Sequence, residues 1–237
     1  MLKSIIRNFV GENTWKKLGE ARQEFRIRKQ NIHMDPLLFE YLNPLLPSVG
    51  YYADIGAHDG RSFSNTYHLE KLGWAGVLVE PMLPTYFRML DMRSKDSNYF
   101  ANAACVSFGY SEKNLLMSYG DLMSFAPEIS TLNAGEWRHG ATQFLNRNET
   151  VIDTWVPAKT LTSIFDHAKS PAQIDFMSID VEGAENEVLD GIDFRKYSFT
   201  YICLETYTPD LILPKLETHG YRSLAYIANN LILQKKS

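Results

Sequence analysis

Short apolar runs alternate with stretches of helical periodicity from Tyr51 to the end of the chain. This alternation is typical of βαβ units, in which buried parallel strands are joined by crossover helices. The predicted strands are Tyr51–Ile55, Gly76–Glu80, Tyr99–Val106, Ile174–Asp180 and Thr200–Glu205. The helices predicted after them are Arg61–Leu72, Pro81–Arg93, Glu185–Leu189 and Asp210–His219. The pattern therefore predicts a doubly wound α/β fold.

The C-terminal region continues this pattern with a hairpin. Tyr221–Ile227 and Leu231–Lys235 are strand-like and flank Asn229-Asn230. Asparagine tolerates the positive φ that a tight hairpin turn needs. The preceding helix is expected to begin behind Thr208-Pro209, with threonine as N-cap and proline in the first turn.

The stretch Ser107–Pro157 fits neither a helix nor a simple strand and is too long for an idle connection. We interpret it as an insertion that covers the site. Its Trp137, Phe144 and Trp155, with Arg138 and His139, suit a polar ligand with apolar faces, because aromatic rings stack on such faces while Arg and His donate to hydroxyls. The alternative is surface structure that only covers a sheet edge.

We expect residues 1–48 to form a separate N-terminal helical arm and residues 49–237 to form the main domain. Eight Lys and Arg against three Glu give residues 1–34 a charge of +5, so the rest of the chain carries −9. An acidic body argues against a nucleic-acid groove. We expect the arm to pack on the body or on a second copy in a homo-oligomer, although peripheral docking on an anionic membrane stays open.

The composition adds few constraints. Hydrophobic residues make up 45% and charged residues 22% of the 237 residues, as in globular proteins. No apolar run approaches the ~18 residues of a membrane span. Cys105 and Cys203 lie in apolar runs without disulfide or metal-ligand spacing, and Arg7 interrupts the N-terminal apolar run. We therefore expect a cytoplasmic protein with reduced thiols.

The first candidate motif is Asp54–Gly60, Asp-Ile-Gly-Ala-His-Asp-Gly, directly after the first strand. Gly56 allows a sharp turn and a close ligand, and Gly60 begins the next helix, whose N–H groups face the same ligand. The spacing G-x-x-x-G is not the G-x-G-x-x-G of dinucleotide-binding turns. A tight turn without a ligand would also use glycines.

The second strand ends at Glu80, 26 residues after Asp54. A carboxylate there can accept hydrogen bonds from both ribose hydroxyls of a nucleoside cofactor. Asn102 and Ala103, in the third strand, would lie near an adenine. The alternative for Glu80 is a surface acid at a strand end.

Three carboxylates follow the fourth strand within six residues: Asp180, Glu182 and Glu185. Ligands of open α/β sheets bind at the carboxyl ends of strands, and clustered acids there have raised pKa values. Glu185 also fits charge compensation at a helix N-terminus, whereas Asp180 does not. Glu205 ends the fifth strand and is expected beside Asp180.

These segments resemble the FkbM family of S-adenosylmethionine-dependent methyltransferases. The matching residues are Asp54–Gly60, with Ala57 and His58 inside the turn, Val79-Glu80-Pro81, Asn102-Ala103-Ala104, Ile174–Glu185, Val188–Gly191 and Leu204-Glu205. The resemblance implies a class I methyltransferase fold, a mostly parallel seven-stranded sheet whose last strand is antiparallel. Three positions depart from the family pattern: His58 replaces Asn, Ser178 replaces Lys, and Thr162 replaces Asp.

The resemblance implies methyl transfer from S-adenosylmethionine to a hydroxyl of a small-molecule, sugar or glycan acceptor. The cofactor site would comprise Asp54, Gly56, Ala57, His58, Gly60, Glu80, Pro81, Asn102 and Ala103. Asp180, Glu205 or His139 would act as general base. Alternatively, Asp180 and Glu205 would hold magnesium, which lowers the pKa of the hydroxyl.

Two other classes of function are weighed against this one. A nicotinamide-dependent oxidoreductase is disfavoured by the missing G-x-G-x-x-G motif. An inactive nucleotide-binding or scaffold protein is disfavoured by the retained acid cluster. A screen of nucleotide binding separates the methyltransferase from the oxidoreductase.

Overall fold

The computed structural model describes residues 33–142, 145 and 150–236 of the chain. The predictions on residues 1–32 and on Phe144 lie outside these residues. The described part of the arm contains one helix, α3 (Pro36–Leu42), whose first turn is capped by the Asp35 carboxylate. Leu38, Phe39 and Leu42 bury the apolar side of α3 against the main domain.

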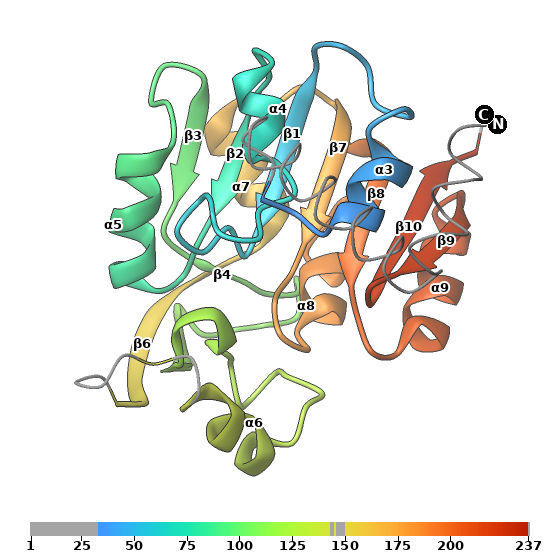
Figure 1. Ribbon diagram of the computed structural model, residues 1–237. Coiled ribbons are helices and arrows are strands. Elements are labelled where there is room, and N and C mark those ends of the chain that lie inside the picture. The colour runs from blue at the N-terminus through green and yellow to red at the C-terminus, as the bar shows by residue number, and fades with distance from the viewer. Residues whose placement is uncertain (1–32, 143–144, 146–149, 237) are drawn as a thin grey trace, which may run out of the picture.

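The main sheet has seven strands in the order β3-β2-β1-β7-β8-β10-β9 (Figure 1). These are β1 (Tyr51–Ile55), β2 (Ala75–Val79), β3 (Asn98–Ala101), β7 (Gln173–Ile179), β8 (Ser198–Glu205), β9 (Tyr221–Ile227) and β10 (Asn230–Lys235). The first five in this order are parallel, and β10 runs antiparallel to both of its neighbours. The predicted doubly wound, mostly parallel sheet is confirmed.

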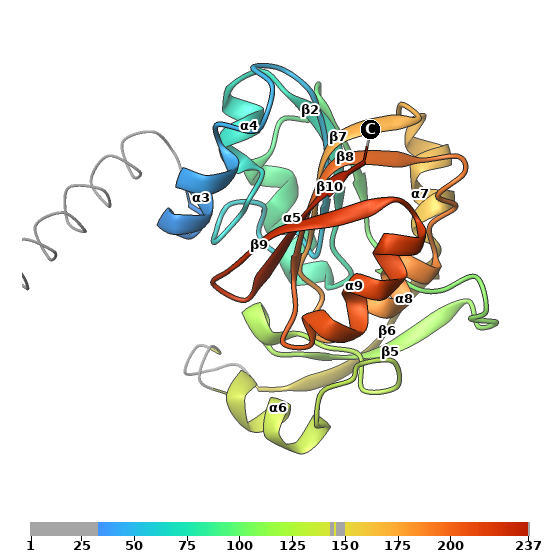
Figure 2. The ribbon, with the colours of Figure 1, turned by 90° about the vertical axis from the view of Figure 1, so that its right-hand side faces the viewer.

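Helices cover both faces of this sheet, which is why its strands read as continuous apolar runs. On one face, Ala53 and Ile55 of β1 share a core with α7 (Leu161–Ala168), α8 (Glu185–Asp190) and α9 (Pro209–Thr218). On the other, Tyr52 shares a core with α3, α4 (Tyr67–Lys71) and α5 (Leu83–Met92). Figure 2 shows α3 and α4 on one side of the sheet and α7, α8 and α9 on the other.

The order of the strands reverses between β1 and β7. The chain moves from β1 outward to β2 and β3, and later returns to add β7 and β8 on the opposite side of β1. In open α/β sheets, this reversal leaves a crevice beyond the carboxyl ends of the central strands. The end of β1 is therefore where a ligand is expected.

The region 107–157 contributes to a second, three-stranded sheet in the order β4-β6-β5. It consists of β4 (Ala104–Cys105), β5 (Asn114–Tyr119) and β6 (Ile152–Lys159), with the short 3-10 helix η1 (Asp121–Met123) and α6 (Ala134–Ala141) between β5 and β6. This second sheet has a small hydrophobic core, which includes Leu115, Met117 and Val156. Figure 1 shows β6 and α6 beneath the main sheet.

Two predicted elements differ from the structure. The predicted strand Tyr99–Val106 is divided between β3 and β4, because the Asn102 side chain donates to the carbonyls of Glu80 and Pro81, at 2.9 and 2.8 Å, as the chain changes sheets. The predicted helix Arg61–Leu72 is helical only in α4. Asp59 accepts the N–H groups of Arg61 and Ser62 in turns that compete with a helix.

The C-terminal hairpin is present, one residue out of register with the predicted turn. Ala228 and Asn229 have φ of 47° and 62°, and Asn230 is the first residue of β10. Two adjacent residues with positive φ are typical of a two-residue hairpin loop. Helix α7 was not predicted at all.

Candidate functional site

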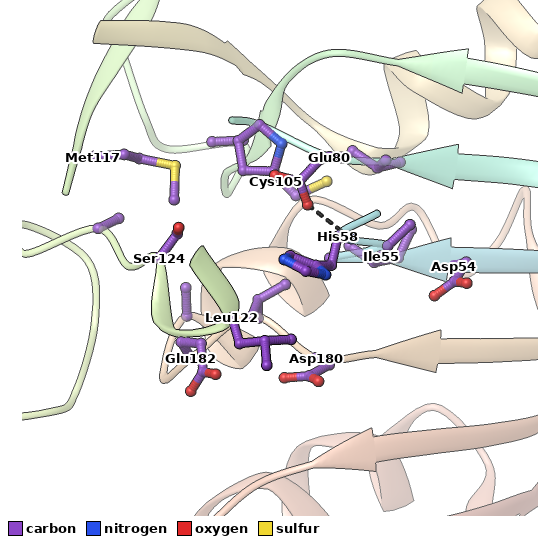
Figure 3. Close-up of a pocket in the computed structure, with 18 of the residues that line it drawn as sticks. Asp54, Ile55, His58, Glu80, Cys105, Met117, Leu122, Ser124, Asp180 and Glu182 are labelled. Atoms are coloured by element: carbon purple, nitrogen blue, oxygen red, sulfur yellow. Dashed lines mark hydrogen bonds between the residues drawn. The ribbon is translucent and has the colours of Figure 1, made fainter. Parts of the chain in front are cut away.

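A cavity of about 960 Å³, counted to its open mouth, lies at the carboxyl ends of β1, β2 and β7. Three segments provide its walls: the turn after β1, the ends of β2 and β7, and the inserted β5–η1 region (Figure 3).

The turn after β1 is held against both neighbouring strands. The N–H groups of Gly56 and Ala57 donate to the Val79 carbonyl, each at 3.0 Å, and the Asp180 N–H donates to Ile55 at 2.9 Å. Gly56 has φ +83°, and a Cβ there would lie 1.7 Å from the Asp180 carbonyl oxygen. Glycine is therefore required for the chain to pass the end of β7, and not only for the approach of a ligand.

Gly60 does not line the cavity, and no helix begins there, contrary to the prediction from the sequence. It has φ +76°, and a Cβ would lie 2.9 Å from Cγ of Arg93. Its side of the turn faces the protein interior. Instead of the predicted helix N-terminus, the irregular segment 61–66 follows the turn. Residues 62–65 of this segment line the cavity.

Asp54 is buried at the base of the cavity. Its Oδ2 accepts hydrogen bonds from the Ser64 hydroxyl at 3.3 Å, from the Thr66 hydroxyl, and from Nη2 of Arg93 at 3.2 Å. Burial raises the pKa of Asp54, while Arg93 and the two hydroxyls act in the opposite direction. These three donors to Oδ2 thus fix the position of the Asp54 carboxylate.

Glu80 is buried, lines the same cavity and is held by three donors. Its Oε2 accepts the His58 N–H at 2.9 Å, and its Oε1 accepts the Met82 N–H at 2.8 Å and the Thr85 hydroxyl at 2.7 Å. Because a carboxylate offers about four acceptor sites, Oε2 retains capacity for a ligand. Burial raises the pKa of Glu80, opposed by these donors.

The remaining predicted cofactor residues divide into two groups. Ala57, His58, Pro81 and Ala103 line the cavity. Asn102 is absent from the described lining, because its amide ties Glu80 and Pro81 in place.

The acids after β7 lie where the cavity meets a smaller adjoining pocket. Asp180 and Glu182 line both spaces, and Glu205 and Glu185 line only the smaller one. Solvent reaches Asp180 through the cavity, yet the surrounding protein still desolvates its carboxylate. This desolvation, with the charges of Glu205 and Asp54, raises the pKa of Asp180. Desolvation and Asp180 likewise raise the pKa of Glu182.

Asp180 and Glu205 end adjacent parallel strands, since Ile179 pairs with Leu204. The structure therefore places the two predicted acids side by side at the sheet edge. Glu185 has a local role, because its Oε1 accepts the Gly183 N–H at 2.8 Å at the start of α8. Among residues 33–142, 145 and 150–236, no group of three or more His, Cys, Asp or Glu is placed to hold a metal ion.

His58 joins the turn after β1 to the inserted segment. Its Nε2 lies 3.1 Å from Oδ1 of Asp121, which also accepts from Nη2 of Arg88 at 2.6 Å. Burial would lower the pKa of His58, but Asp59, Asp121 and Glu80 outweigh it and raise the pKa. The imidazole of His58 thus bridges two walls of the cavity.

His139 and Trp155 do not line the cavity in the described structure, and neither does Trp137. Arg138 pairs with Asp153 at 2.5 Å, and 65% of Trp155 is exposed. The inserted region lines the cavity instead with residues that sequence reasoning missed: Leu115, Met117, Asp121, Leu122, Ser124, Ala126 and Ile129. The sequence offered no signal for them, since only the folding of β5 over the site selects them.

The three departures from the family pattern lie in different places. His58 and Ser178 line the cavity, and Ser178 accepts a hydrogen bond from the Asn65 amide at 3.0 Å. Thr162 lies outside it and donates to the Gly191 carbonyl at 2.9 Å, which joins α7 to the loop after α8.

Both cysteines are free and buried, and burial raises the pKa of each thiol. In the part of the chain that the structure describes, no helix is long and apolar enough to cross a membrane.

Comparisons with known proteins bear on the sequence and the fold. Residues 54–223 match the family described as the methyltransferase FkbM domain. No curated protein matches the sequence. Among solved structures, precorrin-6y C5,15-methyltransferase from Geobacter metallireducens is similar at 15% identity and a TM-score of 0.40, over 82% of this chain and 84% of that one.

Proposed function

Because this chain belongs to the FkbM family of methyltransferases, we propose that it methylates a hydroxyl oxygen of a small-molecule acceptor of the sugar, glycan or related natural-product class. S-adenosylmethionine, which the family implies as the methyl donor, supplies when bound a methyl group already activated on a sulfonium. The protein's task is then to align the acceptor oxygen with that methyl and to take up the proton of the hydroxyl.

The charge of the cavity fits this cofactor. Five of its lining residues are carboxylates, Asp54, Glu80, Asp121, Asp180 and Glu182, and none of those described is Lys or Arg. S-adenosylmethionine carries a cationic sulfonium and an ammonium group, whereas the pyrophosphate of a nicotinamide cofactor would face these acids with His58 as the one basic side chain among the described lining residues. The charge pattern thus supports the methyltransferase over the oxidoreductase.

The position of Asp180 carries the proposal for acceptor chemistry. It opens onto the cavity and onto the adjoining pocket, which is also lined by Thr131, Thr206, Tyr207 and Thr208. An aliphatic hydroxyl needs a base, and the most effective base has a pKa near the working pH. The raised pKa of Asp180 meets that requirement, and Glu205 on the adjacent strand is the second candidate.

A magnesium-dependent version of the reaction would use Asp180 and Glu205 as ligands. We favour proton removal by a carboxylate, because the raised pKa of Asp180 suits a general base without a metal. Activity that disappears with a chelator and returns with magnesium would reverse this preference.

The test begins with calorimetric titration of the full chain with S-adenosylmethionine, with NAD and NADP as competitors. A panel of sugars and hydroxylated natural products is then assayed for transfer of labelled methyl. Asp180→Asn should reduce turnover ~10²–10⁴-fold. The affinity for S-adenosylmethionine should stay within about threefold of the wild type, less than the loss of one charged hydrogen bond.

Two outcomes would contradict the proposal. Binding of NAD but not S-adenosylmethionine would favour the oxidoreductase. Cofactor binding without transfer to any acceptor in the panel would favour the inactive binding protein. Full turnover of Asp180→Asn would eliminate that residue as the base and leave Glu205→Gln as the next variant to measure.

A further inference from the structure

Arg93 is a charged residue in the interior of the protein. It follows the last residue of α5, and its side chain is fully buried beneath the turn after β1. The guanidinium carbon lies 5.5 Å from the ring centres of Tyr52 and Tyr67. A buried charge is costly unless it is paired, so the partners of Arg93 indicate why it is there.

These partners include one acid of the cavity and one acid remote from it. Nη2 lies 3.2 Å from Oδ2 of Asp54 and contacts the Thr66 hydroxyl, and Nη1 lies 3.5 Å from Oε2 of Glu70. Glu70 also accepts from the Asn98 amide at 2.7 Å and pairs with Lys71 at 3.1 Å, away from the cavity. The guanidinium thus joins Asp54 to a fixed polar network.

The geometry at Asp54 is one-sided. Ser64, Thr66 and Arg93 all bond Oδ2. Asp54 also lines the cavity, so its other oxygen, Oδ1, is left for a ligand. Three donors on one oxygen fix the plane of the carboxylate and, with it, the direction of the second oxygen.

Gly60 points to the same residue. A Cβ at position 60 would lie 2.9 Å from Cγ of Arg93 and 3.0 Å from Cγ of Met89. The second glycine of the G-x-x-x-G turn therefore leaves room for the Arg93 side chain to pass under the turn. Two members of the sequence motif, Asp54 and Gly60, have Arg93 as a common neighbour.

We propose that Arg93 is a positioning residue for cofactor binding, which holds Oδ2 of Asp54 so that Oδ1 is presented to S-adenosylmethionine. The inference rests on the proposed function, because it assumes that this cofactor occupies the cavity. Arg93 does not touch the cofactor and acts only through Asp54.

The test compares Arg93→Lys with Glu70→Gln in the full-length protein. Both changes disturb the buried network and should lower the melting temperature. Only Arg93→Lys loses the Nη2 contact with Asp54, since a lysine ammonium cannot reproduce a planar guanidinium that reaches Asp54 and Glu70 at once. We expect Arg93→Lys to weaken S-adenosylmethionine binding about tenfold or more, and Glu70→Gln to change it less than about threefold.

A double-mutant cycle with Asp54→Asn tests whether Arg93 affects binding through Asp54. A purely structural role of Arg93 would not produce this coupling in the binding affinity. If Arg93 acts through Asp54, Arg93→Lys should weaken binding no further in the Asp54→Asn background. Thr66→Val, which removes a second donor to Oδ2, should weaken binding in the same direction and serves if Arg93→Lys does not fold.

Equal affinity in Arg93→Lys and the wild type, or full additivity with Asp54→Asn, would overturn the inference. Should Arg93→Lys fail to fold, unchanged affinity in Thr66→Val would overturn it. A wild-type protein that binds no S-adenosylmethionine would instead contradict the proposed function, so the two failures are distinguishable.

Discussion

Folding makes ionisation of the Asp180 and Glu182 carboxyl groups less favourable. Desolvation and neighbouring carboxylates raise the pKa of both above the ordinary values of 3.8 and 4.5. A group with a raised pKa in the folded state binds more protons when folded than when unfolded. Its contribution to stability is therefore complete below the unfolded-state pKa and is lost as the pH rises through the folded-state pKa.

The free energy of unfolding should accordingly fall as the pH rises from 4 to 9, and Asp180→Asn should remove part of that fall. We expect the variant to be more stable than the wild type at pH 8, by chemical denaturation at several pH values. The exposed Asp96→Asn is the control and should change stability by no more than ~0.5 kcal/mol at any pH. If Asp180→Asn is less stable than the wild type at pH 8, the ionised Asp180 carboxylate does not destabilise the folded protein.

Glu80 both fixes the turn after β1, through the N–H of His58, and lines the cavity. Glu80→Ala should weaken S-adenosylmethionine binding by ~1.5–3 kcal/mol, the range for a hydrogen bond to a charged group. Calorimetry measures the loss.

Thr85→Val is the matched control for Glu80, because it removes one internal donor to Oε1 and leaves the carboxylate in place. It should lower the melting temperature without a comparable loss of affinity. If the two variants lose affinity equally, the contribution of Glu80 is structural and its ribose role is excluded.

At the scale of elements, the inserted β5–η1 region is joined to the main domain by side chains around Asp121. This residue has φ +53° and accepts from Arg88 of α5 and His58 of the β1 turn. Strained backbone at a cavity wall persists only where neighbours determine it. The bridge therefore holds η1 in its place against the cavity.

Arg88→Met should increase amide hydrogen exchange in residues 114–126 while costing less than about 1 kcal/mol of global stability, since Arg88 is partly exposed. Lys196→Met is the control, because it breaks a similarly exposed ion pair, with Asp166, that lies outside the inserted region. Exchange that rises equally in the two variants would mean that the Asp121 bridge has no special role.

At the scale of the whole molecule, the N-terminal arm and the main domain carry opposite net charges. Residues 1–34 carry +5 and the rest of the chain −9. We expect the arm to pack on the acidic body or on a second copy, because Glu12, Glu20 and Glu24 dilute its basic face. Full-length protein should then fail to co-sediment with anionic vesicles at physiological salt.

Salt-sensitive binding to such vesicles that vanishes on deletion of residues 1–30 would establish peripheral membrane association instead. Each Lys or Arg near an anionic leaflet contributes ~1 kcal/mol, so an arm free to dock would give a clear signal. Neutral vesicles are the control for apolar insertion by Ile5, Ile6 and Phe9.

The sequence by itself determined the order of the main-sheet strands along the chain and the edge of the sheet at which the cavity lies. Strand periodicity and the crossover pattern are local, so β1, β2, β7 and β8 were found within a few residues. The carboxyl ends of parallel strands share one edge, so Asp54, Glu80, Asp180 and Glu205 could be placed together from their positions at strand ends alone.

Tertiary structure alone decided what surrounds those acids. Asn102 sends the chain into a second sheet by bonding residues 21 and 22 positions earlier, and Arg93 reaches Asp54 from 39 positions away. Gly56 is needed because the carbonyl of Asp180 passes it. Asp121, rather than His139 or Trp155, lines the cavity because β5 folds over it. Such contacts depend on how distant segments pack, which no periodicity along the chain encodes.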